Sequence, residues 1–417
     1  MELDRNSRLR VGTRAIESLE EAALERIVAD AEATLVRLCA ISSESGNAAG
    51  IRRVANDLKA GLERRGLRVD VADENDAAGK PQPVLIARGP SVADSHLLLL
   101  GHMDTVLPAV EPRIEGRQLS ATGSLDMKGG LVTLLGALDV LAARGEKFPD
   151  DILAVFVPDE ESESLISGSS ANRWSRNARA VLVLEPGQAR GDGETLVAGR
   201  RGMVEWKLEV TGRAAHSGLA YWSGRSALAA GAEWCARAQG LSKSGAAPTV
   251  NVGRIVGGGA EFVRDLARHH DLVGTARQLN VVSDAAIAEG EFRFLTKSDG
   301  DVMLAELTRL TSEIAARHDV TATFTPSMPV GPVDPNGPGA SLVQRTVELA
   351  AKRGLHLEVE DDRGGVSFAN FIAEPARVPV VDGLGPTGDG MHVRGEFLNL
   401  DSLRPRILLL ADLLATL

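Results

Sequence analysis

Residues 96–104 read His-Leu-Leu-Leu-Leu-Gly-His-Met-Asp, and this stretch decides the fold class. Four consecutive leucines are typical of a strand buried on both faces of a mostly parallel sheet. The strand runs out at Gly101, so His102 and Asp104 emerge at its carboxyl end, where open α/β sheets bind ligands. Because alternate residues of extended chain share a face, we expect Asp104 to lie behind His102 and orient its ring. Taken alone, this pair suits a core or capping histidine better than a ligand.

Other short apolar runs lie between turn signals and alternate with segments of helical periodicity. The runs cover residues 84–87, 152–157 and 180–184, and the helical segments cover 19–40, 49–65 and 127–143. This alternation predicts an α/β fold with a mixed, mostly parallel sheet flanked by helices. A last α/β portion from Leu342 to the C-terminus completes the domain.

The pattern changes after Gly199, where Val204, Trp206, Leu208 and Val210 alternate with polar residues. Such alternation is typical of a half-solvated antiparallel strand. The order that follows, β-α-β-β-α-β, predicts an inserted ferredoxin-like domain. Its further elements are expected at 225–238 (helix), 249–255 and 286–294 (strands), 302–317 (helix) and 321–324 (strand). We therefore expect an inserted domain at 199–328 within a discontinuous domain formed by 1–198 and 329–417.

Two polar segments are predicted to be irregular. The Pro/Gly-rich stretch 326–338 suggests a linker back to the larger domain. The stretch 259–277 is expected to be an exposed loop, since the adjacent His269 and His270 offer little geometric support for a metal site of their own.

Composition excludes several classes of function. The 417 residues carry a formal net charge of −11 with 3% aromatics, which argues against nucleic acid and anionic membrane surfaces as partners. Cys39 and Cys235 are far apart, so a disulfide framework or a thiolate metal site is not expected. We see neither a secretory signal in the charged N-terminus nor an apolar run long enough for a membrane span, and we expect a cytoplasmic protein.

Further acidic residues fall where other predicted strands end. Asp126 lies in the run 123–130 (GSLDMKGG) at the start of a helix, Glu160 and Glu161 follow the strand 152–157, and Glu185 follows the strand 180–184. Each has a plain structural alternative, as a helix N-cap or an acidic loop residue. Their repetition at one edge of the sheet predicts a divalent cation, with Zn²⁺ favoured and Mn²⁺ or Co²⁺ as substitutes.

At this point the sequence resembles a known family. Five motifs occur in its order: GHMDTV (101–106), GSLDMKGG (123–130), PDEESES (158–164), VLEP (183–186) and GMH (390–392). They resemble the zinc-dependent amidohydrolases and exopeptidases that include glutamate carboxypeptidase, aminoacylase and succinyl-diaminopimelate desuccinylase. The resemblance runs from about residue 20 to the end. It looks closest to glutamate carboxypeptidase through Gly202 and the run 212–218 (GRAAHSG).

The resemblance implies a zinc-exopeptidase-like fold and a site with two Zn²⁺ per chain. Asp126 would bridge the two ions, His102 and Glu185 would hold one, and Glu161 and His392 the other. Glu160 would be the general base that takes a proton from the attacking water, with Asp104 orienting His102. Glutamate at position 185 favours the carboxypeptidase and acylase branch of the family over the aminopeptidases.

The inserted domain would act as a lid and as the interface of a homodimer. His216 resembles the histidine that supports the developing oxyanion in the partner subunit's site. Asn280 and Arg293 match the pair that recognises the substrate's terminal carboxylate, a task suited to the planar fork of arginine. The plain alternatives are a loop histidine and a solvated strand arginine.

Two departures from the family bear on specificity. Phe368 stands in the run 364–370 (GGVSFAN) where the family often has Asp, so we expect a reshaped pocket beside the site. The stretch 261–276 is read as an insertion near the substrate-binding elements. The expected activity is release of a C-terminal or N-acylated amino acid from a small peptide or N-acyl amino acid. The alternatives are an N-carbamoyl- or N-acyl-amino acid amidohydrolase of the same architecture and a non-catalytic, metal-bound peptide-binding protein.

Overall fold

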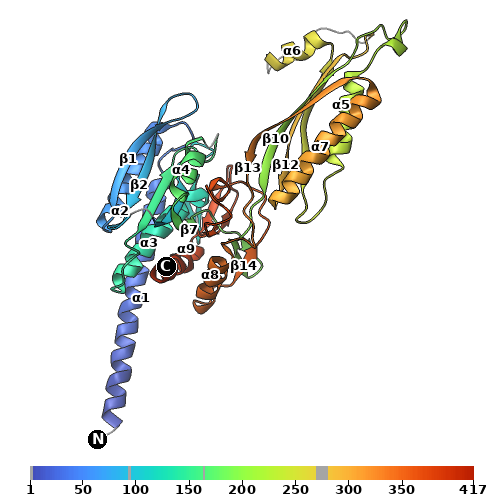
Figure 1. Ribbon diagram of the computed structural model, residues 1–417. Coiled ribbons are helices and arrows are strands. Elements are labelled where there is room, and N and C mark those ends of the chain that lie inside the picture. Colours follow the sequence, from blue (N-terminus) through green and yellow to red (C-terminus); the bar gives the residue numbers. More distant parts are fainter. Residues whose placement is uncertain (1–2, 93–94, 163–164, 269–279) are drawn as a thin grey trace. The chain divides into compact units, whose positions relative to one another are not determined.

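The computed structural model describes residues 3–92, 95–162, 165–268 and 280–417. The chain forms two compact units (Figure 1). The first comprises Met1–Ala198, Pro335–Asp361 and Ser367–Leu417, and the second comprises Gly199–Asp334 and Asp362–Val366. The second unit thus extends six residues beyond the expected range 199–328 and also includes the segment Asp362–Val366. Arg201 holds that segment, since its guanidinium binds both carboxylate oxygens of Asp362 at 2.6 and 2.7 Å.

A six-stranded mixed sheet forms the centre of the first unit. Its order is β1-β2-β6-β3-β7-β15; β6, β3, β7 and β15 run parallel to one another, whereas β2 pairs antiparallel with both β1 and β6. The strands are β1 (Arg68–Asn75), β2 (Pro81–Arg88), β3 (His96–His102), β6 (Ile152–Val157), β7 (Ala178–Val183) and β15 (Val380–Val381). Every residue of β3 is buried, as the leucine run predicts. The antiparallel edge strand β1 was not expected, because its polar sequence lacks an apolar run.

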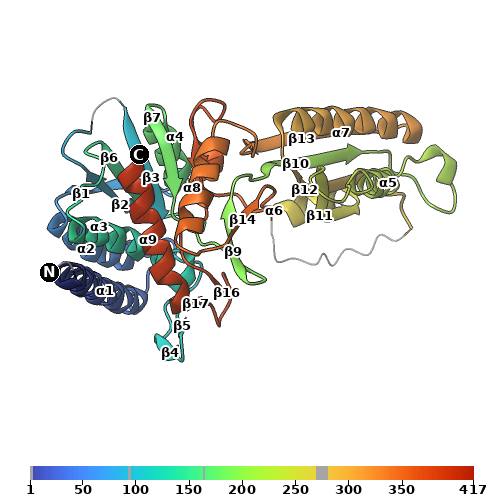
Figure 2. The same cartoon turned by 90° about the horizontal axis from the view of Figure 1, so that it is seen from below.

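Helices flank this sheet, and α3 packs between α1 and α9 (Figure 2). The helices are α1 (Leu3–Cys39), α2 (Ala48–Arg64), α3 (Gly129–Ala143), α4 (Leu165–Ser175), α8 (Ala340–Lys352) and α9 (Leu400–Thr416). Helix α3 begins at Gly129 rather than 127, because Asp126 and Met127 have non-helical backbone angles. In the described part of the chain, no helix has both the length and the apolar character needed to cross a membrane.

Two small sheets complete the first unit, and neither was expected. One has the order β16-β17-β5-β4 and the other β14-β9-β8. Their strands are β4 (Arg113–Glu115), β5 (Gln118–Ser120), β8 (Ala189–Arg190), β9 (Gly193–Val197), β14 (Leu357–Glu360), β16 (Gly388–Asp389) and β17 (Phe397–Asn399). Most of these strands are too short to show an alternation in the sequence.

The second unit is a four-stranded antiparallel sheet with order β11-β12-β10-β13, the order of a ferredoxin-like βαββαβ fold. The inward residues of β10 pack with α5 and α7 around Trp206 and Trp234, whose ring centroids are 5.0 Å apart. The elements are β10 (Gly202–Thr211), α5 (Ala227–Gln239), β11 (Thr249–Gly258), α6 (Ala260–Arg268), β12 (Ala285–Phe294), α7 (Lys297–His318) and β13 (Thr321–Val330).

Two expectations about irregular segments were wrong. The described part of 259–277 contains helix α6, which buries Val263 and whose first backbone N–H, that of Ala260, donates to Asp284 at 2.8 Å. The pair His269–His270 lies outside the described residues. Residues 326–330 belong to β13 rather than to a linker. Strand β13 lies at an edge of its sheet, which is where strands usually tolerate a proline such as Pro326.

Candidate metal centre

Three of the five predicted ligands, together with Glu160, lie at the carboxyl ends of three parallel strands. His102 is the last residue of β3, and its backbone pairs with Val157 at the end of β6. Glu160 and Glu161 follow β6, and Glu185 lies two residues beyond the end of β7. Because parallel strands end at one edge of the sheet, chain direction alone brings these side chains together.

The carboxylate of Asp126 lies between the two histidines. Its Oδ1 is 3.1 Å from His102 Nε2, and its Oδ2 is 3.2 Å from His392 Nε2. On the first side, His102 Nε2 is 3.8 Å from Glu185 Oε1. On the second side, His392 Nε2 is 3.0 Å from Glu161 Oε2. Asp126 is therefore shared by two sets of nitrogen and oxygen atoms.

These separations fit a pair of tetrahedral metal sites. Two ligand atoms at zinc distances and a tetrahedral angle are about 3.3 Å apart. Glu185 Oε1 is buried and has no hydrogen-bond partner among the described residues, which suits an atom reserved for a cation. The carboxylate of Glu160 also lies within 4.8 Å of His102 and Glu185 ligand atoms, so it borders the same space.

The electrostatics of the cluster show an excess of buried negative charge. Burial, together with the charges of Asp126 and Glu160, raises the pKa of Glu185 well above its usual value. Burial also raises the pKa of Glu160 to about 8. Hydrogen bonds to Asp126 and Glu161 raise the pKa of His392 to about 10. In this metal-free state the carboxylates resist ionisation and the imidazoles keep their protons. Bound divalent cations would reverse both tendencies, since they favour ionised carboxylates and neutral imidazoles.

Asp104 contacts both the His102 ring and the turn that follows β6. His102 Nδ1 donates to the backbone carbonyl of Asp104 at 3.0 Å, while the nearer carboxylate oxygen is 3.4 Å away. The carboxylate also accepts hydrogen bonds from the backbone N–H groups of Glu160 at 3.2 Å and Glu161 at 3.1 Å, and from the hydroxyl of Ser45 at 2.7 Å. One residue therefore ties the histidine ring to the turn that carries both glutamates.

Asp126 is not a helix N-cap. Lys128 is the residue before α3, and no side chain caps that helix. The Asp126 turn is held instead by Glu396, a buried residue that the sequence reasoning missed. The only signal was its place four residues after His392, which resembles any acidic loop position.

Phe368 lies beside the site but does not line an open pocket. Its ring centroid is 6.2 Å from that of His102, and its side chain is completely buried. Neighbouring Ser367 donates to Asp382 at 2.9 Å and fixes the turn. Phe368 therefore packs behind the His102 ring, which differs from the reshaped substrate pocket that its size suggested.

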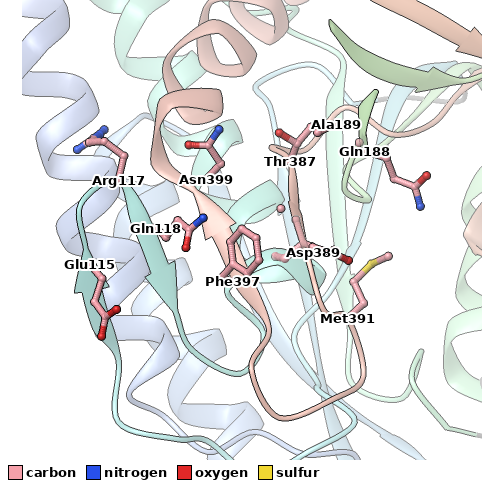
Figure 3. Close-up of a pocket in the computed structure, with 13 residues that line it drawn as sticks. Glu115, Arg117, Gln118, Gln188, Ala189, Thr387, Asp389, Met391, Phe397 and Asn399 are labelled. Atoms are coloured by element: carbon pink, nitrogen blue, oxygen red, sulfur yellow. The ribbon is translucent and has the colours of Figure 1, made fainter. Parts of the chain in front are cut away.

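A surface cavity of about 780 Å³ is lined by residues of the small β16–β17–β5–β4 sheet and of neighbouring loops (Figure 3). Leu125, Gln188 and Met391 line it, and each is close in sequence to a predicted ligand. Its other lining residues come mainly from the small β4–β5–β17–β16 sheet, and no predicted site residue is among the described residues that line it. This cavity is therefore separate from the cluster of predicted ligands.

In the second unit, His216 and Asn280 lie side by side. The backbone of His216 bridges to Val281, and the Ser217 N–H donates to the Asn280 carbonyl at 2.9 Å. His216 Nδ1 accepts the backbone N–H groups of Gly218 and Leu219 at 3.1 and 3.2 Å. A neutral ring with Nδ1 as acceptor carries its proton on Nε2, so Nε2 is a donor.

Arg293 lies at the other end of the same sheet. It is the ninth of ten residues in β12, whereas Asn280 lies five residues before β12 begins. Its Nε and Nη2 each donate to Glu291 at 2.9 Å, and Nη1 donates to the Gly364 carbonyl at 3.3 Å. Guanidinium has five N–H groups, so two are left for a ligand. Eight residues of strand, about 26 Å, separate Arg293 from the start of β12.

Known proteins share both the sequence pattern and the fold. Carboxypeptidase G2 of Pseudomonas sp. (strain RS-16) is 26% identical over 388 residues, which cover 91% of this chain and 88% of that protein. Succinyl-diaminopimelate desuccinylase of Methylobacterium sp. (strain 4-46) is 34% identical over 136 residues, covering 29% and 34% of the two chains. The crystal structure of aminopeptidase PepT from Bacillus cereus ATCC 10987 has a TM-score of 0.74 at 20% identity, covering 94% of this chain and 98% of that one.

The sequence pattern of one peptidase family matches residues 98–416, which contain His102, Asp126, Glu160, Glu185 and His392. This range extends from β3 through the whole second unit to the end of α9. The resemblance drawn from the five motifs is therefore confirmed, and the chain belongs to peptidase family M20/M25/M40.

Proposed function

We propose that this protein is a dinuclear metal-dependent amidohydrolase of the carboxypeptidase and aminoacylase type. The observation that carries the proposal is the carboxylate of Asp126, which faces His102 with one oxygen and His392 with the other. Glu185 would complete the first metal's ligands and Glu161 the second's, with Zn²⁺ as the expected ion and Co²⁺ or Mn²⁺ as substitutes. When bound, such ions polarise an amide carbonyl and lower the pKa of water.

Glu160 is the general base in this proposal. Its pKa is raised to about 8 by burial, and neighbouring cations would bring it down toward neutral pH. A carboxyl group poised near the working pH takes a proton from water and returns it to the leaving amine. Asp104 fixes its position by accepting the backbone N–H of Glu160.

His216 would support the oxyanion. The two backbone N–H groups that point at Nδ1 keep the proton of the neutral ring on Nε2, from which it can be donated to a developing negative charge. This contact fixes the tautomer without a second ionisable group.

Two chains would be needed to assemble the substrate site. Asn280 and Arg293 lie beyond and near opposite ends of β12, about 26 Å or more apart in one chain. Asn280 and Arg293 of one protomer therefore cannot both bind the same substrate carboxylate. We therefore propose a homodimer in which His216 and Asn280 serve the partner's site, and Arg293 uses its two remaining N–H groups on a substrate carboxylate.

The substrate class is a small peptide or N-acyl amino acid that ends in a free carboxylate. An N-carbamoyl- or N-acyl-amino acid amidohydrolase would use the same residues and differ only in the acyl group. A non-catalytic peptide binder has no use for Glu160, so retention of that residue argues against it.

The test combines metal analysis with a substrate panel of dipeptides, N-acyl and N-carbamoyl amino acids, each with and without chelator. We expect about two metal ions per chain, chelator-sensitive release of an amino acid, and a Glu160→Gln variant that binds metal normally but turns over roughly 10²–10⁴-fold more slowly. Fewer than two ions per chain would refute the dinuclear site. Two ions without chelator-sensitive turnover on any substrate would favour the binding protein.

A further inference from the structure

We propose that Glu396 is a positioning residue that locks the Asp126 loop to the His392 loop and so sets the affinity of the metal pair. This inference rests on the dinuclear site proposed above. It concerns a residue that is neither a ligand nor a base, since its carboxylate contacts backbone N–H groups of the neighbouring loop.

The small sheet brings the two loops together. Strands β16 and β17 form a hairpin whose connecting loop, residues 390–396, carries both His392 and Glu396. Strand β17 pairs with β5, and the chain runs from β5 directly into the turn that holds Asp126. The pairing continues past the strands, because the Ala121 N–H donates to the Glu396 carbonyl at 3.2 Å.

Beyond the last backbone hydrogen bond, the Glu396 carboxylate continues the contact between the two loops. Its Oε2 accepts the Gly123 N–H at 2.8 Å, and its Oε1 accepts those of Leu125 at 2.9 Å and Asp126 at 3.0 Å. The last of these is the amide of the shared ligand itself. Residues 270 or more apart in sequence are thereby joined through one side chain.

The turn requires this support. Gly123 has a φ of +73°, and a Cβ there would lie 2.5 Å from Thr105 Cγ2. The φ of His392 is +67°, in the left-handed region that non-glycine residues seldom occupy. Both loops thus hold uncommon backbone conformations, and Glu396, only 6% exposed, is the buried group that bonds one to the other.

A glutamine cannot replace the carboxylate without loss. Both carboxylate oxygens accept hydrogen bonds from N–H groups, whereas one of the two terminal atoms of an amide is itself a donor. Glu396→Gln therefore sets a donor against a buried N–H, either that of Gly123 or those of Leu125 and Asp126. Partners of this kind around metal ligands typically change metal affinity or activity roughly 10–100-fold.

The experiment titrates metal-free protein with Zn²⁺, and with Co²⁺ to follow the visible absorption of each site. For Glu396→Gln we expect affinity at one or both sites to fall roughly 10–100-fold, with the Co²⁺ spectrum altered. Asp412→Asn is the matched control. Asp412 is a half-buried carboxylate on α9 that pairs with Arg144 and Arg353, so its loss should lower Tm and leave both metal affinities unchanged.

Wild-type metal affinities and spectrum in a folded Glu396→Gln variant would overturn the proposal. Should that variant fail to fold, Glu396→Asp keeps the charge but is one methylene too short to reach all three N–H groups, and unchanged affinities there would overturn it equally. An equal loss of metal affinity in Asp412→Asn would also overturn it, by showing general destabilisation. If the wild type itself binds fewer than two ions, the dinuclear function fails instead.

Discussion

Replacing Asp104 by Asn separates two possible roles of this residue, since it removes the charge and keeps the volume. The carboxylate accepts Ser45 Oγ–H and the backbone N–H groups of Glu160 and Glu161. An Asn side chain whose oxygen keeps Ser45 and Glu161 must turn its NH₂ group toward the Glu160 N–H. One buried donor without a partner costs about 1–3 kcal/mol. We therefore expect a fall in Tm of at least about 2 °C and a displaced Glu160.

The assay measures kcat at saturating metal together with metal affinity. If Asp104 mainly anchors the Glu160 turn, kcat of Asp104→Asn should fall roughly 10–100-fold and excess metal should not restore it. If it mainly orients His102, the loss should lie in metal affinity and excess metal should restore kcat. Ser45→Ala, which removes one donor and leaves the charge, should show a smaller effect in the same direction. Recovery of full kcat by metal alone would refute the anchoring role.

Three further changes test other parts of the site. Glu160→Gln should lower kcat roughly 10²–10⁴-fold with the metal content unchanged, as measured by metal analysis and turnover in parallel. His216→Ala should cost on the order of 10²–10³ in kcat, and wild-type turnover in that variant would exclude an oxyanion role. Gly130→Ala would place a Cβ 2.0 Å from the Leu184 carbonyl, so α3 must move from the end of β7. Thermal unfolding should show that the free energy of unfolding falls by about 1–3 kcal/mol. Metal affinity should fall as well, because Glu185 directly follows Leu184 in the chain.

The parts of the fold that follow from local sequence were predictable. The run 97–100 is apolar at every position, short, and followed by Gly101, which favours a strand covered on both faces, so β3 could be placed. The alternation from Val204 to Val210 equally placed β10. Once strand direction was known, His102 and Glu185 had to lie at the same edge, since parallel strands end together.

The parts that depend on distant contacts were not predictable from the residues alone. Strands β16 and β17 have two and three residues and exist because β17 pairs with β5, about 280 positions earlier in the chain. The same holds for Phe368, whose burial against His102 depends on how residues 364–370 return to the sheet. Helix α6 was missed because its polar sequence offers few buried positions, and Asp284, which caps it, lies beyond the segment itself.

Acidic residues at strand ends have different roles that their spacing does not distinguish. In the run 159–161, Asp159 accepts the backbone N–H groups of Ile166 and Ser167 and so caps α4, while Glu160 and Glu161 face the metal cluster. What separates them is the partner each carboxylate meets: backbone N–H groups for the positioning acids, imidazoles and other carboxylates for the proposed ligands. Since an N–H donor already stabilises a buried negative charge, a carboxylate so engaged has little to gain from a cation.

The proposed ligand Glu185 meets the opposite condition, because its Oε1 is buried and accepts no hydrogen bond from the described residues. An unpaired buried carboxylate oxygen costs free energy in the metal-free protein, and binding of a cation recovers that cost. Removing this carboxylate by Glu185→Gln should therefore stabilise the metal-free fold or leave it unchanged, while it weakens metal binding. The paired acid Asp159 should behave in the opposite way on replacement by Asn, with lower stability in the metal-free state. Thermal unfolding with and without chelator measures both, and a destabilised metal-free Glu185→Gln variant would contradict this distinction.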